Sequence, residues 1–137
     1  MISQNSITDP SASANTAPWE RRKRRSDNTA DALEYALDSA AQRGQLDAVL
    51  IVDDFGLLVS QSRHESDLRE VAAITPIVGR GQARATVRHQ GQAHQLSVRT
   101  VSLLGEHLHV AAVGGNDASR RREIATAIRA ARRILAA

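Results

Sequence analysis

The fold of this chain is decided by residues 48–60, which read AVLIVDDFGLLVS. The apolar run Ala48–Val52 is rich in β-branched residues and too short for a helix, so it predicts a strand. Asp and Gly at positions 53–56 favour a tight turn, and Leu57–Ser60 has the composition of a second strand. The stretch therefore predicts a β-hairpin.

The segment before this hairpin predicts an amphipathic helix from about Thr29 to Arg43. Leu33 and Leu37 recur at helical spacing, and acidic residues occupy the other faces. Residues 26–29 offer side chains that can cap a helix start, and Gly44 stands where a left-handed residue is expected at its end.

The segment after the hairpin predicts a second helix that opens at Ser66 or Asp67 and runs through Val78. Residues 79–81, Gly-Arg-Gly, end it. Pro76 lies inside this helix and lacks a backbone N–H, so we expect a kink or a shortened last turn.

Three more strands and a closing helix complete the predicted fold. The strands span Arg84–His89, Gln95–Leu103 and Leu108–Val113, separated by glycine-containing breaks suited to tight turns. The closing helix has an apolar stripe of Ile124, Ala127, Ile128, Ala131 and Leu135. Its other face is basic, with Arg120, Arg121, Arg122, Arg129, Arg132 and Arg133. The prediction is an α+β fold in which a five-stranded antiparallel sheet arises from the order α-β-β-α-β-β-β-α.

Charge is concentrated at the N-terminus. The 137 residues carry a net charge of +3, and residues 1–26, with five basic and two acidic side chains, account for all of it. Their polar composition predicts a disordered basic tail, followed by one domain over residues 27–137. The basic run can act as a tether to an anionic membrane or to nucleic acid, as a nuclear import signal, or as a solvated flank. The tether candidates are Trp19, Arg21, Arg22, Lys23, Arg24 and Arg25.

Composition narrows the function classes. The chain has no cysteine, which excludes disulfides, thiolate metal sites and thiol catalysis. It has one Trp, one Tyr and one Phe, which weighs against a base-stacking RNA binder. No apolar run approaches the roughly 20 residues that span a bilayer. We expect a cytoplasmic protein, peripheral to the membrane if its tail binds lipid.

Short motifs yield no catalytic constellation. Asp54-Phe55-Gly56 matches a kinase triplet, but the only lysine is Lys23 and no catalytic loop is present. His107 and His109 point to one face of a strand, and His89 and His94 flank a turn, but no third metal ligand is nominated. We interpret them as exposed strand-edge histidines. The predictions are therefore no catalytic, cofactor-binding or metal-binding residue, no cofactor and no small-molecule substrate.

From Leu33 to Leu135 the sequence resembles the Roadblock family, named for a dynein light chain. The resemblance rests on residues 53–60, on Leu68-x-x-Val71-Ala72-Ala73, and on Leu108-x-Val110-Ala111 followed by Gly114 and a helix. It implies a profilin-like α/β sandwich, with the first and last helices on one face of the sheet and the second helix on the other.

The resemblance also implies a mode of association and a function. Roadblock domains form homodimers or heterodimers with another Roadblock-like chain through the second helix and third strand, which here implies contacts by Leu68, Val71, Ala72, Ile74, Thr75, Val78, Ala85 and Val87. Such dimers are non-enzymatic regulators or scaffolds of small Ras-like GTPases, as activators or effectors in bacterial signalling, polarity or motility. The alternative is a GTPase-independent assembly module that its basic tail recruits to membrane or nucleic acid.

Overall fold

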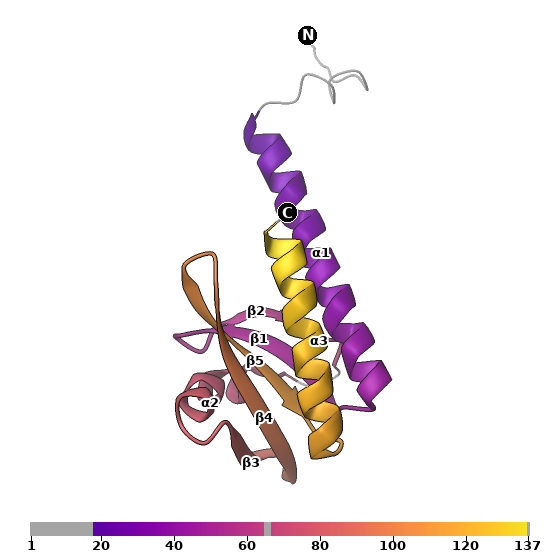
Figure 1. The fold of residues 1–137 in the computed structure, drawn as a ribbon, viewed down its shortest axis with the longest axis vertical. Helices are drawn as coiled ribbons and strands as arrows, with labels where there is room; N and C mark the ends of the chain where they lie inside the picture. The colour runs from indigo at the N-terminus through magenta and orange to yellow at the C-terminus, as the bar shows by residue number, and fades with distance from the viewer. Residues whose placement is uncertain (1–17, 65–66, 137) are drawn as a thin grey trace.

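The computed structural model describes residues 18–64 and 67–136, with side chains described from Asp27 onward. The predicted order of elements is confirmed (Figure 1). The elements are α1 (Pro18–Gly44), β1 (Ala48–Asp53), β2 (Leu58–Gln61), α2 (Arg69–Arg80), β3 (Arg84–His89), β4 (Gln92–Leu103), β5 (Glu106–Val113) and α3 (Asp117–Leu135). Within the described residues no helix is long and apolar enough to span a membrane.

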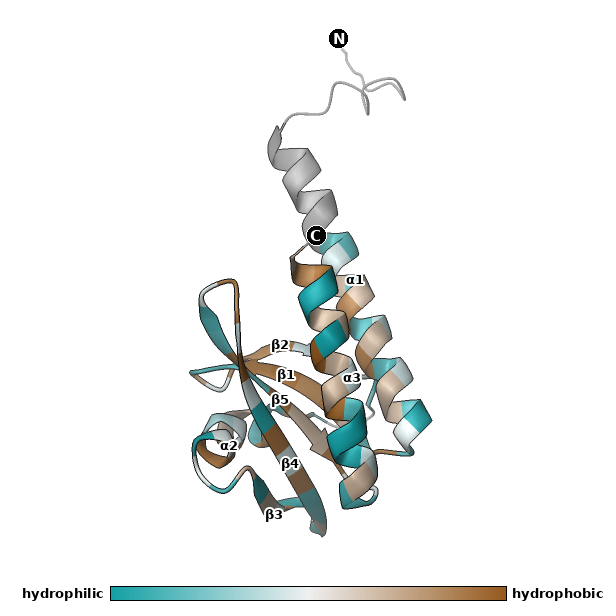
Figure 2. Cartoon of the chain, viewed as in Figure 1, coloured by the Kyte–Doolittle hydropathy of each residue, from teal (hydrophilic) through white to brown (hydrophobic). Residues whose placement is uncertain are grey.

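The strands form one antiparallel sheet in the order β2-β1-β5-β4-β3. β1 and β5 lie inside the sheet, and Figure 2 shows most of β1 as apolar. The pairing of β1 with β2 is irregular between Ile51 and Val52, which is typical of a β-bulge. β2 and β3 are the edges of the sheet.

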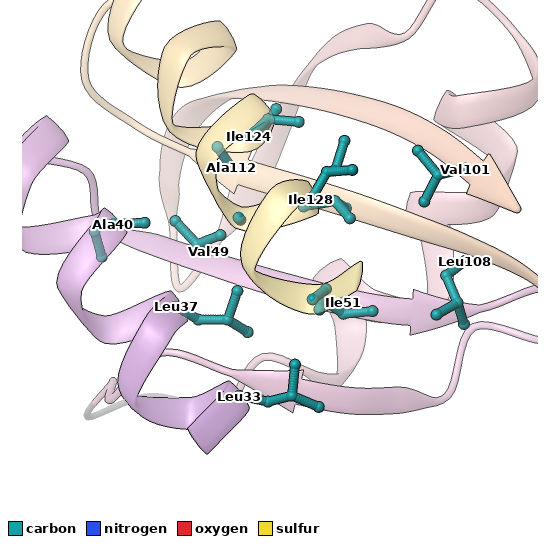
Figure 3. Packing of buried hydrophobic residues seen from close by; sticks show 14 of the residues in the cluster. Leu33, Leu37, Ala40, Val49, Ile51, Val101, Leu108, Ala112, Ile124 and Ile128 are labelled. Carbon is teal, nitrogen blue, oxygen red and sulfur yellow. The ribbon is translucent and has the colours of Figure 1, made fainter. Parts of the chain in front are cut away.

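Alternate side chains of β1 pack into two hydrophobic cores, one on each face of the sheet, because successive residues of a strand point to opposite faces. Val49 and Ile51 pack with Leu37 of α1 and Ile128 of α3 (Figure 3). On the opposite face, Leu50 and Val52 pack with Val71 of α2, with Leu68, Ala72, Val87 and Leu96 in the same cluster. The α+β sandwich implied by the resemblance is confirmed.

The first helix begins at Pro18, eleven residues before the predicted start at Thr29. Pro is favoured in the first turn of a helix, and the Arg, Lys and Glu residues that follow it are good helix formers. The cap-forming residues 26–29 therefore lie inside the helix, and α1 crosses the predicted boundary between tail and domain. Residues 1–17 of the predicted tail lie outside the described residues.

The end of α1 also differs from the prediction. The left-handed residue is Gln45, with φ 53°, and not Gly44. Gly44 is needed for a different reason, because a Cβ there would stand 2.7 Å from Cγ of Glu123. The missing side chain allows α1 to approach α3 closely at this point.

The remaining boundaries shift by a few residues. α2 continues to Arg80, so Pro76 does not end it, and Pro76 is itself buried. β4 and β5 each begin earlier than predicted because their turns contain only two residues, Gln90-Gly91 and Leu104-Gly105. All four have positive φ, as two-residue hairpin turns require.

Candidate interaction surface

Five of the eight predicted interface residues lie in the core of the protomer and not on its surface. Leu68, Val71, Ala72, Thr75 and Val87 are each no more than 7% exposed. The helix has two apolar stripes, and the stripe that these α2 residues form faces the sheet. Their contacts are therefore made within the chain.

A second apolar stripe of α2 faces outward. Ile77 is 66% exposed, and Ile74 and Val78 are half-buried. These three residues follow the i, i+3, i+4 spacing of one helix face, so the sequence contained the signal, but Ile77 was not among the predicted contacts. Ile74, Val78 and Ala85 of β3 are half-buried and also pack against the core cluster that contains Leu50 and Val71, so Ile77 is the exposed residue of this stripe. We call Ile74, Ile77, Val78 and Ala85 the α2–β3 surface.

Two glycines hold α2 tightly against the sheet and the β1–β2 turn. A Cβ at Gly79 would stand 2.8 Å from Oγ1 of Thr100 and 2.9 Å from Nδ1 of His109. A Cβ at Gly56, where φ is +83°, would stand 3.0 Å from Cα of Ala73. Only glycine permits both approaches, so α2 and its outward stripe are held at a fixed position.

A chain of hydrogen bonds connects the β1–β2 turn to the sheet beneath α2. Oδ1 of Asp54 lies 2.6 Å from Nε2 of His109, and Nδ1 of the same ring lies 2.7 Å from Oγ1 of Thr100. An ionised carboxylate only accepts, so Nε2 donates to it, and in the neutral ring Nδ1 accepts from the hydroxyl. Both nitrogens of this fully buried ring are therefore satisfied.

Further basic groups surround the Asp54 carboxylate. Arg80, at the end of α2, and His107 each approach it to 3.6 Å. The hydrogen bond from His109 lowers the pKa of Asp54 below its ordinary value, and the charges of the neighbouring basic groups lower it further. The carboxylate thus connects the turn to α2 and β5.

The order carboxylate, imidazole and hydroxyl is also that of an activated nucleophile. Here, however, Oγ1 of Thr100 is bonded to Nδ1 of His109 and lies close to Gly79, where a Cβ would stand 2.8 Å from it. We interpret the chain of hydrogen bonds as structural. The prediction of exposed histidines holds for His107 but is wrong for His109 and His89, which are both buried. The nitrogens of His109 are bonded to Asp54 and Thr100, and His94 is half-buried beside Asp47.

The β1–β2 turn itself has the predicted form. Oδ1 of Asp53 accepts hydrogen bonds from the backbone N–H of Phe55 (2.8 Å) and Leu57 (3.0 Å). This arrangement leaves Phe55 88% exposed and Leu57 64% exposed. The turn therefore presents apolar side chains to solvent.

Two charged residues of α3 were not predicted to be buried. Arg120, expected on the basic face, donates to Oγ of Ser97 and to the backbone carbonyls of Gly114 and Gly115. Glu123 is paired with Arg43 of α1 at 2.9 Å and with Arg122. Burial raises the pKa of Glu123, but the hydrogen bonds and charges of its two arginines outweigh burial and lower it.

Comparison with known proteins identifies the fold. No protein-family model and no curated protein matches the sequence. Among solved structures, Myxococcus xanthus MglB is 14% identical, with a TM-score of 0.57, and the match covers 77% of this chain and 89% of that one. The gliding protein MglB from Thermus thermophilus is 15% identical, with a TM-score of 0.58 and coverage of 77% and 90%. An MglB with a tetrameric arrangement is 15% identical, with a TM-score of 0.56 and coverage of 77% of this chain and 89% of that one. The chain has the fold of these proteins, which is the Roadblock-like fold that the sequence resembles.

Proposed function

We propose that the chain is a non-enzymatic regulator or scaffold of a small Ras-like GTPase and acts as a dimer. The observation that carries the proposal is the α2–β3 surface, an outward apolar stripe beside an edge strand, in a fold shared with the MglB structures. The Roadblock resemblance supports the same partner class. The chain is proposed to reshape or hold the GTPase in bacterial signalling, polarity or motility without contributing a catalytic group.

The proposed dimer follows from the position of β3 at the edge of the sheet. The outer backbone groups of β3 have no strand partner among the described residues, and a second copy can pair with them and join the two sheets. The same contact would cover Ile77, which is 66% exposed in the single chain. A heterodimer with another Roadblock-like chain would use the same surface.

The dimer is tested by Ile77→Asp, measured by light scattering after size exclusion. The proposal expects wild-type protein at twice the mass of one chain and the variant at one. Tyr35→Asp is the matched control, because Tyr35 is 76% exposed and lies on α1, on the opposite face of the sheet. A dimer that survives Ile77→Asp would overturn the proposed surface.

The GTPase is tested by capture from the native lysate with the full-length chain as bait, in parallel with GDP and with a non-hydrolysable GTP analogue. A small GTPase enriched with the analogue supports the proposal, and turnover assays then separate an activator from an effector. If no GTPase binds in either nucleotide state, the proposed partner is wrong.

The basic run is the basis of the second candidate, an assembly module recruited to membrane or nucleic acid. The tether residues, Trp19 and 21–25, lie within the first turns of α1, so five consecutive basic residues occupy one helical segment. Contact with anionic lipid contributes about 1 kcal/mol per basic residue near the surface. Deletion of residues 1–26 should abolish sedimentation with anionic vesicles and retention on nucleic acid. Binding unchanged by the deletion would remove this candidate.

A further inference from the structure

The sheet has an uncovered area on the face that carries α1 and α3. Ser97 of β4 points to this face, because its hydroxyl accepts a hydrogen bond from Arg120 of α3, and Arg84 is its partner on β3. Residues two apart along a strand share a face, so Thr86 and Arg88 point the same way. All three of these β3 residues are exposed, so neither helix covers β3 on this side.

Arginine is the dominant residue of this uncovered area. A hollow of about 460 Å³ between β3, β4 and the start of α3 is lined by Arg84, Arg99 and Arg121. Arg84 and Arg121 are 69% and 71% exposed, and both approach the carboxylate of Asp117, which they share with the buried Arg120. One carboxylate therefore faces three guanidiniums, and the other exposed arginines of this area have no ion pair among the described residues. We define the arginine surface as Arg84, Arg88, Arg99 and Arg121.

A stripe of acidic residues on α1 complements the arginine surface in charge and in length. Its members follow the spacing i, i+4, i+7 and i+11, which places them on one helix face, and none has an ion pair among the described residues. The stripe is about 16 Å long, and Arg84 and Arg88 are about 13 Å apart along β3. Figure 1 shows the first turns of α1 extending beyond the end of α3, where they are open to a partner. We define the acidic stripe as Asp27, Asp31, Glu34 and Asp38, of which the first three are exposed.

We propose that the acidic stripe of one copy of this chain docks on the arginine surface of a second copy. The docked α1 would lie on the uncovered area of the sheet, beside α3 of the second copy, and its carboxylates would accept hydrogen bonds from the arginines around the hollow. Charges that have no partner, or only a shared one, within one chain are then paired between chains. Because two different surfaces meet, the contact is heterologous and can join more than two copies.

This contact is separate from the dimer of the proposed function. The dimer uses the edge of β3 and Ile77 of α2, whereas the arginine surface lies on the opposite face of the sheet, with α3. A chain that makes both contacts assembles beyond the dimer, as a scaffold would. The contact does not depend on the dimer, because Ile77→Asp leaves both charged surfaces intact.

The test is sedimentation of the full-length protein at several protein concentrations, in about 0.1 M and about 1 M salt, between which the Debye length falls from about 10 Å to about 3 Å. The expected result is species larger than the dimer at the lower salt concentration that are lost at the higher one. In Ile77→Asp the same salt-dependent association should start from the single chain. This variant separates a failure of the charged contact from a failure of the dimer.

Charge reversal tests the two surfaces directly. The double variants Arg84→Glu/Arg99→Glu and Asp31→Arg/Glu34→Arg should each weaken association roughly tenfold or more, because each brings like charges together. An equal mixture of the two should associate again, because each reversed surface then meets its opposite. Glu106→Arg is the matched control, because Glu106 is exposed at the start of β5 and lies outside both surfaces.

Three outcomes would overturn the contact. The first is wild-type protein no larger than the dimer at the lower salt concentration, together with an Ile77→Asp variant that stays a single chain. The second is association that either double variant retains alone, or that their mixture does not restore, with the fold of each variant checked by circular dichroism. The third is larger species that form only with added nucleic acid, which would show that the arginine surface binds an anionic polymer instead.

Discussion

Oδ1 of Asp54 lies 2.6 Å from Nε2 of His109, although 55 positions separate them in the sequence. The bond connects the turn after β1 to the buried face of β5, and Arg80 brings the end of α2 to the same carboxylate. Because α2 carries the outward stripe, the position of that stripe depends on a turn that lies far from it in the sequence.

Asp54→Asn should lower the free energy of unfolding at pH 7. The folded pKa of Asp54 lies below its ordinary value of 3.8, so its contribution is present above that value and is lost as the pH falls through the folded pKa. The stability of the variant should therefore fall less steeply than that of wild type below about pH 4. Chemical denaturation from pH 7 to pH 2.5 measures this, with Asp31→Asn on the exposed face of α1 as the control. If the free energy of unfolding of wild type and of Asp54→Asn changed with pH in the same way, Asp54 would not stabilise the fold through its ionised carboxylate.

Gly79→Ala should destabilise the protein, although alanine is the better helix former. The new Cβ would stand 2.8 Å from Oγ1 of Thr100 and 2.9 Å from Nδ1 of His109, so α2 or these bonded side chains must shift. Overpacking of this kind costs about 1–3 kcal/mol. Gly81→Ala is the control, because its nearest contact would be an ordinary 3.4 Å. Equal unfolding midpoints for the two variants would show that Gly79 is not a contact point.

Much of the fold follows from local patterns. Residues 48–60 predict the hairpin because a short β-branched run and an Asp-Gly turn are both local signals. The start of α1 could not be located in this way, because residues 26–29 can cap a helix or lie within one. Their role depends on whether the segment from Pro18 onward is helical.

The candidate site was less predictable, because burial is decided by distant partners. The sequence alone predicts His109 and Arg120 to be surface residues. In the folded chain Asp54 bonds to His109, and the carbonyls of Gly114 and Gly115 bond to Arg120, so both can be buried. The choice of which α2 stripe faces the sheet is likewise decided by residues that are distant in the sequence. Both stripes have helical spacing, and only the position of the helix on the sheet separates them.

The two stripes of α2 predict opposite effects. Val71→Ala removes a side chain that is 2% exposed and should cost about 1–3 kcal/mol of stability without weakening the dimer. Ile77→Ser should change the stability of the single chain by about 0.5 kcal/mol or less but weaken association. Denaturation at several protein concentrations separates the two effects, because dissociation makes the midpoint depend on concentration. If the unfolding midpoint lost its dependence on protein concentration with Val71→Ala but kept it with Ile77→Ser, the dimer surface would be the stripe of Val71 and not that of Ile77.

Arg120→Lys should destabilise the protein although the charge is kept. The guanidinium donates from Nε to Ser97 at 2.8 Å and from a terminal nitrogen to the carbonyls of Gly114 and Gly115 at 2.9 Å. A single ammonium cannot reproduce this fork, so at least one buried acceptor loses its partner, which costs about 1–3 kcal/mol. The control is Arg121→Lys, whose side chain is 71% exposed and should change stability by about 0.5 kcal/mol or less. Because both variants lie at the start of α3 and keep the same charge, a larger loss at Arg120 isolates the geometry of the buried guanidinium. A loss at Arg120 as small as that at Arg121 would mean that the positive charge, which both variants keep, is sufficient there and that the guanidinium geometry is not needed.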